Sequence, residues 1–360
     1  MKSEGPVPFG IIGHGWRADF YLRIARELPE RFEVARMLVR REETAAKLRS
    51  EWGVEAFTDI DAFLDGSEMP FVVVSVPRDA CAVYIRELAK RGVPVLAETP
   101  PARDLAGLTE LYAAVGPDTK VQVAEQLLFQ PMHAARIALA RSGRLGPISQ
   151  AQVSVSHGYH GVSLIRQLLG VSFEDAEIRG ERFLSPIVQG PGRDGPPKEE
   201  AVKMTRQDLA TLRFGDRLGV FDFTGEQYFS WIRSSRVLVR GLRGEIVNED
   251  AAWLESFDTP VLTKFSRVDN GFGPNLLGHH YSGVLLGSEW IYRNPFAPGK
   301  LTDDEIAIAT ALDKMADYAE GGPSFYSLAE ASQDHYLGML IDQAIESDTT
   351  IVSERQIWHP

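Results

Sequence analysis

The sequence is poor in cysteine, in long apolar runs and in positive charge. Its single cysteine in 360 residues, Cys81, excludes an intramolecular disulfide bond and a zinc site built from several cysteines. Apolar runs such as residues 71–76 fall far short of the roughly 20 residues that cross a bilayer. Because residues 1–6 also lack the apolar core of a secretory signal, we expect a cytoplasmic protein with no membrane partner.

Charge and metal-binding motifs narrow the function further. The 38 lysines and arginines are outnumbered by 50 aspartates and glutamates, which gives a formal net charge of -12. Such a chain lacks the basic face of a general nucleic-acid-binding protein. It has no His-Glu-x-x-His sequence and no EF-hand loop, so no metal is implied. The length, with 44% hydrophobic and 24% charged residues, is typical of a folded protein with two domains.

Short apolar runs alternate with helical spacing over the first third of the chain. Strands that alternate with helices favour a parallel, doubly wound α/β sheet. We therefore predict that residues 1–130 form a first domain of this class. Its strands are predicted from the apolar runs at residues 7–13, 32–39, 71–76, 94–97 and 120–124.

The pattern changes after Pro131. A Gly/Pro-rich stretch at residues 189–197 reads as a surface loop, and closing helices are predicted near residues 303–320 and 329–347. We predict that residues 131–360 form an α+β domain with a mainly antiparallel sheet, whose last helices pack back on the first domain. Its strand candidates lie at residues 148–156, 210–213, 217–223, 228–232, 235–241 and 244–249, and several of those after residue 200 have hairpin spacing.

A glycine-rich turn follows the first predicted strand. Gly13, Gly15 and Ala18 fit the pattern G-x-G-x-x-G/A at the point where the strand passes into a helix. Small residues allow the tight turn there and let the backbone approach a pyrophosphate at the helix N-terminus. Glycines in such a turn can also be purely structural, but the β-α-β context predicts a dinucleotide site.

The end of the second predicted strand indicates the type of cofactor. An acidic residue there would bind the ribose hydroxyls of NAD, whereas this chain has Arg40 and Arg41. Arginine can hold a 2′-phosphate with two parallel hydrogen bonds, so NADP is favoured over NAD. The alternative is that both arginines lie at a solvated helix start and pair with Glu42 or Glu43.

Further segments follow in a particular order. They are Ser75-Val76-Pro77-Arg78, Glu98-Thr99-Pro100, Glu125-Gln126 with the nearby Gln130-Pro131, and His160 at the start of a predicted helix. In this order they resemble the Gfo/Idh/MocA oxidoreductase family, named for glucose-fructose oxidoreductase and inositol dehydrogenase, over essentially the whole chain. The resemblance implies an N-terminal Rossmann domain and a C-terminal domain whose open sheet supplies the substrate pocket and often an oligomer interface. It also implies hydride exchange between a nicotinamide and a sugar-like alcohol or carbonyl compound.

The glycine turn and the family resemblance together imply a set of cofactor contacts. We predict that the cofactor is bound by Gly13, His14, Gly15, Trp16, Arg17, Arg40, Arg41, Ser75, Pro77, Arg78, Glu98, Thr99 and Gln126.

The sequence departs from the family at the catalytic positions. The lysine of the family's Glu-Lys-Pro element is Thr99 here, and the two aspartates near the family's histidine are Ser156 and Ser163. A threonine hydroxyl is too weak an acid to cycle as a base, although Thr99 can orient a carbonyl or the nicotinamide amide. We therefore predict His160 as the proton carrier, because histidine titrates near neutral pH, and Tyr159 as a second candidate that donates to a carbonyl oxygen.

Three functions remain open from the sequence. The leading hypothesis is an NADP- or NAD-dependent oxidoreductase that acts on CH-OH groups of a sugar-like small molecule. The missing lysine also allows a redox-neutral, NAD-dependent glycosidase or lyase, or a ligand-binding family member without catalysis. In each case we expect a homodimer or homotetramer, because an antiparallel sheet with an exposed face can form such an interface.

Overall fold

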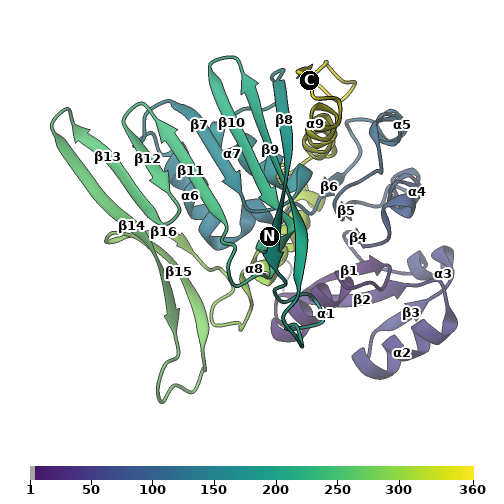
Figure 1. Cartoon of the computed structure of the whole chain (residues 1–360). Coiled ribbons are helices and arrows are strands. Elements are labelled where there is room, and N and C mark those ends of the chain that lie inside the picture. The colour runs from purple at the N-terminus through teal and green to yellow at the C-terminus, as the bar shows by residue number, and fades with distance from the viewer. Residues whose placement is uncertain (1–4) are drawn as a thin grey trace.

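The computed structural model describes residues 5–360, which form two β-sheets with helices packed on them (Figure 1). The N-terminal sheet has six parallel strands in the order β3-β2-β1-β4-β5-β6, which is the doubly wound Rossmann arrangement predicted from the sequence. These strands are β1 (Val7–Ile12), β2 (Phe32–Leu38), β3 (Glu55–Phe57), β4 (Val72–Val74), β5 (Val95–Ala97) and β6 (Val121–Val123).

Helices cover the two faces of this sheet, so its inner strands consist almost entirely of buried apolar residues, as in the Val72–Val74 run of β4. The strand order reverses between β1 and β4, and in such sheets ligands bind in the crevice at the carboxyl ends of the strands beside that point. The helices are α1 (Ala18–Glu27), α2 (Glu42–Trp52), α3 (Ile60–Leu64), α4 (Arg78–Lys90) and α5 (Leu105–Val115).

The second sheet has eleven strands in the order β16-β15-β14-β13-β12-β11-β7-β10-β9-β8-β17. Only the β7–β10 pair is parallel among these described strands, so the prediction of a mainly antiparallel sheet is confirmed. The strands are β7 (Ile148–Ser154), β8 (Glu177–Val188), β9 (Val202–Phe214), β10 (Arg217–Thr224), β11 (Arg236–Gly241), β12 (Gly244–Val247), β13 (Asp250–Ser256), β14 (Thr259–Asn270), β15 (His280–Leu286), β16 (Glu289–Arg293) and β17 (Ile351–Val352).

Helices of the second half join the two sheets. Helix α7 (Gly158–Leu169) packs on β7 and β10 and against α9 (Leu328–Ser347), which also contacts β6. Helix α8 (Asp303–Ala319) lies against α1, where Arg23 Nε is 2.8 Å from Glu305 Oε1. The short η1 (Leu127–Phe129) and α6 (Pro131–Arg141) lead from β6 into this half. In the part of the chain from residue 5 onward, no helix is both long and apolar enough to span a membrane.

One predicted strand, at residues 228–232, is wrong. The chain instead forms a 3-10 helix, η2 (Gly225–Tyr228), closed by a capping box between Thr224 and Gln227. The Gln227 amide also donates to the carbonyl oxygens of Ser154, at 3.0 Å, and Ser234, at 2.8 Å. These bonds satisfy the turn internally and hold Tyr228 over the start of α7, so the segment cannot join the β-ladder.

Candidate functional site

A cavity of about 790 Å³ lies at the carboxyl ends of the N-terminal strands, beside the reversal of strand order. The second half of the chain closes it with the start of α7 and with Arg193 from the β8–β9 loop. Every predicted site residue except Gln126 lines it: Gly13, His14, Gly15, Trp16, Arg17, Arg40, Arg41, Ser75, Pro77, Arg78, Glu98, Thr99, Tyr159 and His160.

Glycine occurs at positions 13 and 15 of the turn for different physical reasons. Gly13 has φ +108°, and a Cβ there would lie 2.1 Å from the Ser75 carbonyl oxygen, so the fold itself requires glycine. A Cβ on Gly15 would meet no protein atom within 4 Å. The chain's own packing therefore does not need Gly15, whose missing side chain leaves open space at the cavity wall, just before α1 begins at Ala18.

Arg17 lies between the glycine turn and the end of β5. Its Nε is 3.9 Å from Glu98 Oε1, and the Tyr21 hydroxyl donates to the same carboxylate oxygen at 2.6 Å. Burial raises the pKa of Glu98, while Arg17 and the bond from Tyr21 act in the opposite direction. Arg17 Nη1 is buried and has no hydrogen-bond partner within residues 5–360, so this cavity-lining guanidinium retains an unused donor.

Gln126 lies behind Arg17 and is absent from the cavity wall. In the amide orientation that satisfies both of its polar atoms, its oxygen accepts from Arg17 Nη2 at 3.1 Å and its nitrogen donates to the Ala124 carbonyl at 3.2 Å. Gln126 therefore supports the guanidinium. Its direct contact with a cofactor stays a prediction.

Arg40 and Arg41 lie at the cavity rim, after the end of β2, with exposed side chains. Neither forms an ion pair with another residue of the described chain, and Glu42 pairs with Arg49 instead. Within residues 5–360, Arg40 and Arg41 therefore form no ion pair with Glu42 or Glu43. Thr44, one turn further on, also lines the cavity and was missed, because a single threonine gives no motif signal.

His160 is buried at the start of α7, and its Nδ1 lies 2.6 Å from Glu125 Oε2. The Glu125 side chain is fully buried and accepts the Leu127 backbone N–H through its other oxygen, at 3.0 Å. A carboxylate at this position holds the ring with Nδ1 as the donor, which leaves Nε2 with a free lone pair. No role was predicted for Glu125 from the sequence. Its place just after a buried parallel strand was the available signal that it belongs to a site.

Tyr159 and Thr99 lie beside His160 in the cavity wall. The Tyr159 and His160 rings are 4.3 Å apart between centroids. Burial raises the pKa of Tyr159 to about 12, although Arg78 and a hydrogen bond with Thr99 act in the opposite direction. The phenol therefore stays protonated at neutral pH and can donate to an oxygen in the cavity.

His157 is a second histidine of the cavity wall, and no role was predicted for it from the sequence. The Tyr228 hydroxyl lies 2.6 Å from His157 Nδ1, 2.7 Å from Ser156 Oγ and 3.2 Å from the His157 backbone nitrogen. Burial lowers the pKa of His157 to about 4, with His160 and Arg78 acting in the same direction. Sequence reasoning missed Tyr228, because it lies 71 residues away in a segment predicted as a strand.

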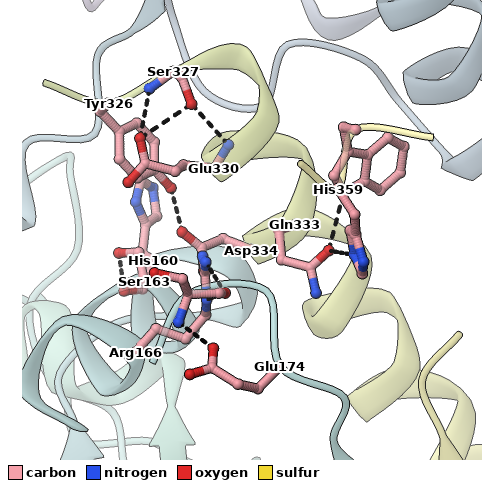
Figure 2. Close-up of polar contacts among 12 residues, drawn as sticks. His160, Ser163, Arg166, Glu174, Tyr326, Ser327, Glu330, Gln333, Asp334 and His359 are labelled. Carbon is pink, nitrogen blue, oxygen red and sulfur yellow. Dashed lines mark hydrogen bonds and ion pairs between the residues drawn. The ribbon is translucent and has the colours of Figure 1, made fainter. Parts of the chain in front are cut away.

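A buried polar network joins α7 to α9 (Figure 2). Arg166 of α7 donates to Asp334 of α9, which also accepts the Tyr326 hydroxyl. Burial raises the pKa of Asp334 to about 6, against the effect of Arg166. An unpaired polar group in such a buried network would cost free energy. Because a shift of one helix along the other would break these pairs, the network holds the two helices in one register.

The N-terminal part of the chain matches a known family model. Residues 7–125 match the model GFO_IDH_MocA, described as an oxidoreductase family with an NAD-binding Rossmann fold. Among curated proteins, no sequence matches the chain. The match covers the strands and turns that form the N-terminal side of the cavity.

Solved structures share the fold along the whole chain. The apo form of levoglucosan dehydrogenase has a TM-score of 0.70 at 17% identity and covers 97% of this chain and 99% of its own. An oxidoreductase from Agrobacterium radiobacter, solved with NAD+, L-tartaric acid and magnesium, has a TM-score of 0.68 at 14% identity, with coverage of 97% and 98%. An NAD-binding oxidoreductase from Klebsiella pneumoniae has a TM-score of 0.67 at 15% identity, with coverage of 98% and 100%. At these identities the likeness establishes the shared fold.

Proposed function

We propose that this chain, whose residues 7–125 belong to the Gfo/Idh/MocA oxidoreductase family, is an NAD(P)-dependent oxidoreductase acting on a sugar-like alcohol or carbonyl compound. The observation that carries the proposal is one cavity that joins a glycine turn suited to a pyrophosphate to a carboxylate-paired histidine. In this proposal residues 1–130 hold the cofactor, and residues 131–360 supply the substrate side.

The turn after β1 fits a dinucleotide in two independent ways. Gly15 leaves space that no protein atom fills, at the N-terminus of a helix whose free N–H groups favour an anion. Arg17 adds a buried, unpaired donor at the same wall. When bound, a nicotinamide dinucleotide supplies the hydride acceptor or donor.

His160 is the proposed proton carrier. In alcohol oxidation the carbinol hydrogen leaves as hydride, the hydroxyl proton moves to His160 Nε2, and a carbonyl remains. Glu125 favours this step because a carboxylate 2.6 Å from Nδ1 stabilises the imidazolium that forms. In carbonyl reduction the same proton returns from Nε2 to the new alkoxide oxygen.

Thr99 and Tyr159 are the proposed orienting groups beside that proton carrier. Thr99 stands where the family has its lysine, and its hydroxyl can hydrogen-bond a substrate oxygen or a carboxamide. Tyr159 stays protonated at neutral pH, because burial raises its pKa to about 12, and so it acts as a donor to the carbonyl oxygen.

NADP is the proposed preferred cofactor. Arg40 and Arg41 are exposed at the rim of the cavity without ion-pair partners in the described chain, so both guanidinium groups are available for a 2′-phosphate. No acidic side chain lines the cavity at the end of β2, where a ribose diol would be bound.

Replacing Gly15 tests the proposal directly. In Gly15→Val the new Cβ meets no protein atom within 4 Å, so the melting temperature should stay unchanged while affinity for NADP+ and NAD+ falls at least tenfold in calorimetry. Turnover of a panel of sugars and polyols by the wild type, followed as nicotinamide absorbance, completes the test. Wild-type protein that binds neither dinucleotide would overturn the proposal, and glycoside cleavage without net absorbance change would favour redox-neutral chemistry.

A homodimer or homotetramer is also proposed, formed through the free face of the large sheet. Strand pairing puts Val247, Leu254 and Leu262 on one face, and all three are exposed. The opposite face carries Ile246 and Ala251, which are buried. Exposed apolar side chains on a sheet face are typical of an interface, and sedimentation of the wild type against Leu262→Glu tests it.

A further inference from the structure

The two histidines of the cavity wall have their Nδ1 atoms held by different partners. The His157 and His160 rings lie 5.1 Å apart between centroids and are perpendicular, and both face the same cavity. Glu125 Oε2 is 2.6 Å from Nδ1 of His160, and the Tyr228 hydroxyl is 2.6 Å from Nδ1 of His157. A neutral imidazole has one donor and one acceptor nitrogen, so the partner of Nδ1 decides what Nε2 presents to a ligand.

At His160 the partner can only accept. The Glu125 carboxylate is buried, and its other oxygen is occupied by the Leu127 backbone N–H at 3.0 Å. The ring proton therefore lies on Nδ1 of His160. Its Nε2 presents a lone pair to the cavity, as a proton acceptor requires.

At His157 a count of hydrogens decides the tautomer. The Tyr228 oxygen must accept the His157 backbone N–H. The hydroxyl hydrogens of Tyr228 and Ser156 are then available for the two remaining contacts of Tyr228, with Ser156 Oγ and with His157 Nδ1. Ser156 is buried, and within residues 5–360 its hydroxyl has no hydrogen-bond partner other than Tyr228. If Tyr228 donated to Ser156, the serine hydrogen would have no acceptor, which costs free energy in a buried site.

The other arrangement uses every hydrogen. Ser156 donates to Tyr228, and Tyr228 donates to His157 Nδ1, which is the stronger acceptor. Burial lowers the pKa of His157 to about 4, so the ring is neutral at neutral pH. Its single proton is then on Nε2, and His157 presents a donor to the cavity where His160 presents an acceptor.

We propose that His157, held by Tyr228, determines substrate specificity by donating a hydrogen bond to an oxygen on the carbon next to the reacting carbon. The ligand class is a vicinal diol or an α-hydroxy carbonyl compound. The inference rests on the proposed function and deepens it. The reacting hydroxyl would give its proton to His160 Nε2, and a bound nicotinamide would supply the hydride acceptor. The neighbouring oxygen accepts from His157 and is chemically unchanged. Two perpendicular rings at 5.1 Å can address two adjacent oxygens, which themselves lie about one hydrogen-bond length apart.

A compound with an isolated hydroxyl leaves the His157 donor unpaired. His157 lies in the cavity wall, where a bound ligand would cover it. A polar group that a ligand covers but leaves unpaired discriminates strongly against that ligand, whereas an apolar pocket does not. We therefore expect kcat/KM for cyclohexane-1,2-diol to exceed that for cyclohexanol by at least about tenfold in the wild type.

The test combines these two alcohols with two variants. His157→Phe removes the donor, and Tyr228→Phe removes the hydroxyl that fixes its tautomer but keeps the ring packed on Phe223, at 5.1 Å. The diol-to-monoalcohol ratio should fall to near one in His157→Phe and severalfold in Tyr228→Phe. Tyr318→Phe, a phenol on α8 away from the cavity, is the matched control and should keep the wild-type ratio.

A spectroscopic readout separates this inference from the proposed function. Imidazole 15N–1H correlation spectra of the intact protein should show His157 protonated at Nε2 and His160 at Nδ1, with a mixture at His157 in Tyr228→Phe. A wild-type His157 protonated at Nδ1, or an unchanged ratio of the two alcohols in His157→Phe, would overturn the inference even if the enzyme is active. Wild-type protein that oxidises neither alcohol nor any other CH-OH compound would overturn the proposed function, and the spectra would still decide the tautomers.

Discussion

The glycine end and the histidine end of the cavity are built in different ways. At the glycine end, backbone groups and open space come from one continuous segment. The packing of the fold requires glycine at position 13, whereas Gly15 leaves open space in the cavity. At the histidine end, each ring depends on a side chain from another element: Glu125 follows β6, and Tyr228 belongs to η2. One end is therefore encoded locally, and the other is encoded by the packing of distant segments.

This difference separates two kinds of sensitivity. A backbone site tolerates most side-chain changes but fails when its space is filled. A side-chain site keeps its shape after many substitutions but loses its chemistry when a proton is moved from one nitrogen to another. Variants at the histidine end should therefore change turnover with little effect on cofactor affinity, and variants at the glycine end and rim should do the opposite.

The largest expected effect is at His160. His160→Ala removes the proposed proton carrier, so kcat should fall about 100- to 10 000-fold, the usual contribution of a positioned acid or base. Affinity for NADP+ should change less than about threefold, because the glycine turn remains. Steady-state kinetics and calorimetry on the same preparation check both. Turnover that survives in His160→Ala would mean that the proton moves elsewhere.

The two arginines at the cavity rim should give the next largest effect. In the double variant Arg40→Ser and Arg41→Ser, two guanidinium groups available for a 2′-phosphate are lost, so NADP+ affinity should fall about 30- to 100-fold. Binding of NAD+, which lacks that phosphate, is the internal control and should stay nearly constant. Equal losses for both dinucleotides would show that the arginines do not read the phosphate.

The sequence predicted the glycine end almost completely and the histidine end only in part. Gly13, Gly15, Arg40 and Arg41 could be placed, because a strand followed by a tight turn and a helix fixes where its residues go. His160 was identified through the family resemblance. Its partner Glu125 is 35 residues away and has no spacing rule, so only the fold brings the two together.

The same limit applies to the fold. Five of the six parallel strands followed from apolar runs buried on both faces. Strands β3, β8 and β13 to β17 were missed, and residues 228–232 were assigned to the wrong element. In β14, exposed and buried positions mix with charges and Pro260, so periodicity is weak. Tyr228 lies outside the sheet because Thr224 and Gln227 cap a helical turn there, and an alternation of apolar residues cannot reveal such a cap.

A smaller effect is expected from Glu125→Gln. The amide oxygen can still accept from Nδ1 of His160, so the ring keeps its place, but the charge that stabilises an imidazolium is gone. We expect kcat to fall about tenfold with KM nearly unchanged, and the His160 Nδ1 proton resonance to move upfield. Glu110→Gln, an exposed carboxylate on α5, is the control. A loss of melting temperature with no change in the resonance would mean that Glu125 only supports the fold.

The smallest effect on turnover is expected at a histidine outside the cavity. His133 of α6 is buried, its Nδ1 accepts from Arg136 Nη1 at 3.2 Å, and burial together with Arg136 lowers its pKa to about 3. The unfolded chain takes up this proton below about pH 6.5 and the folded chain does not, so stability is lost as the pH falls from 6.5 towards 3. His133→Gln retains an acceptor for Arg136 without titrating. Between pH 7 and 4.5 it should lose less unfolding free energy than the wild type, by at most about 2 to 3 kcal/mol in urea titrations, with turnover unchanged at pH 7. An identical acid sensitivity in both proteins would mean that His133 is protonated in the folded state, and a fall in turnover would mean that a packing histidine acts at the site.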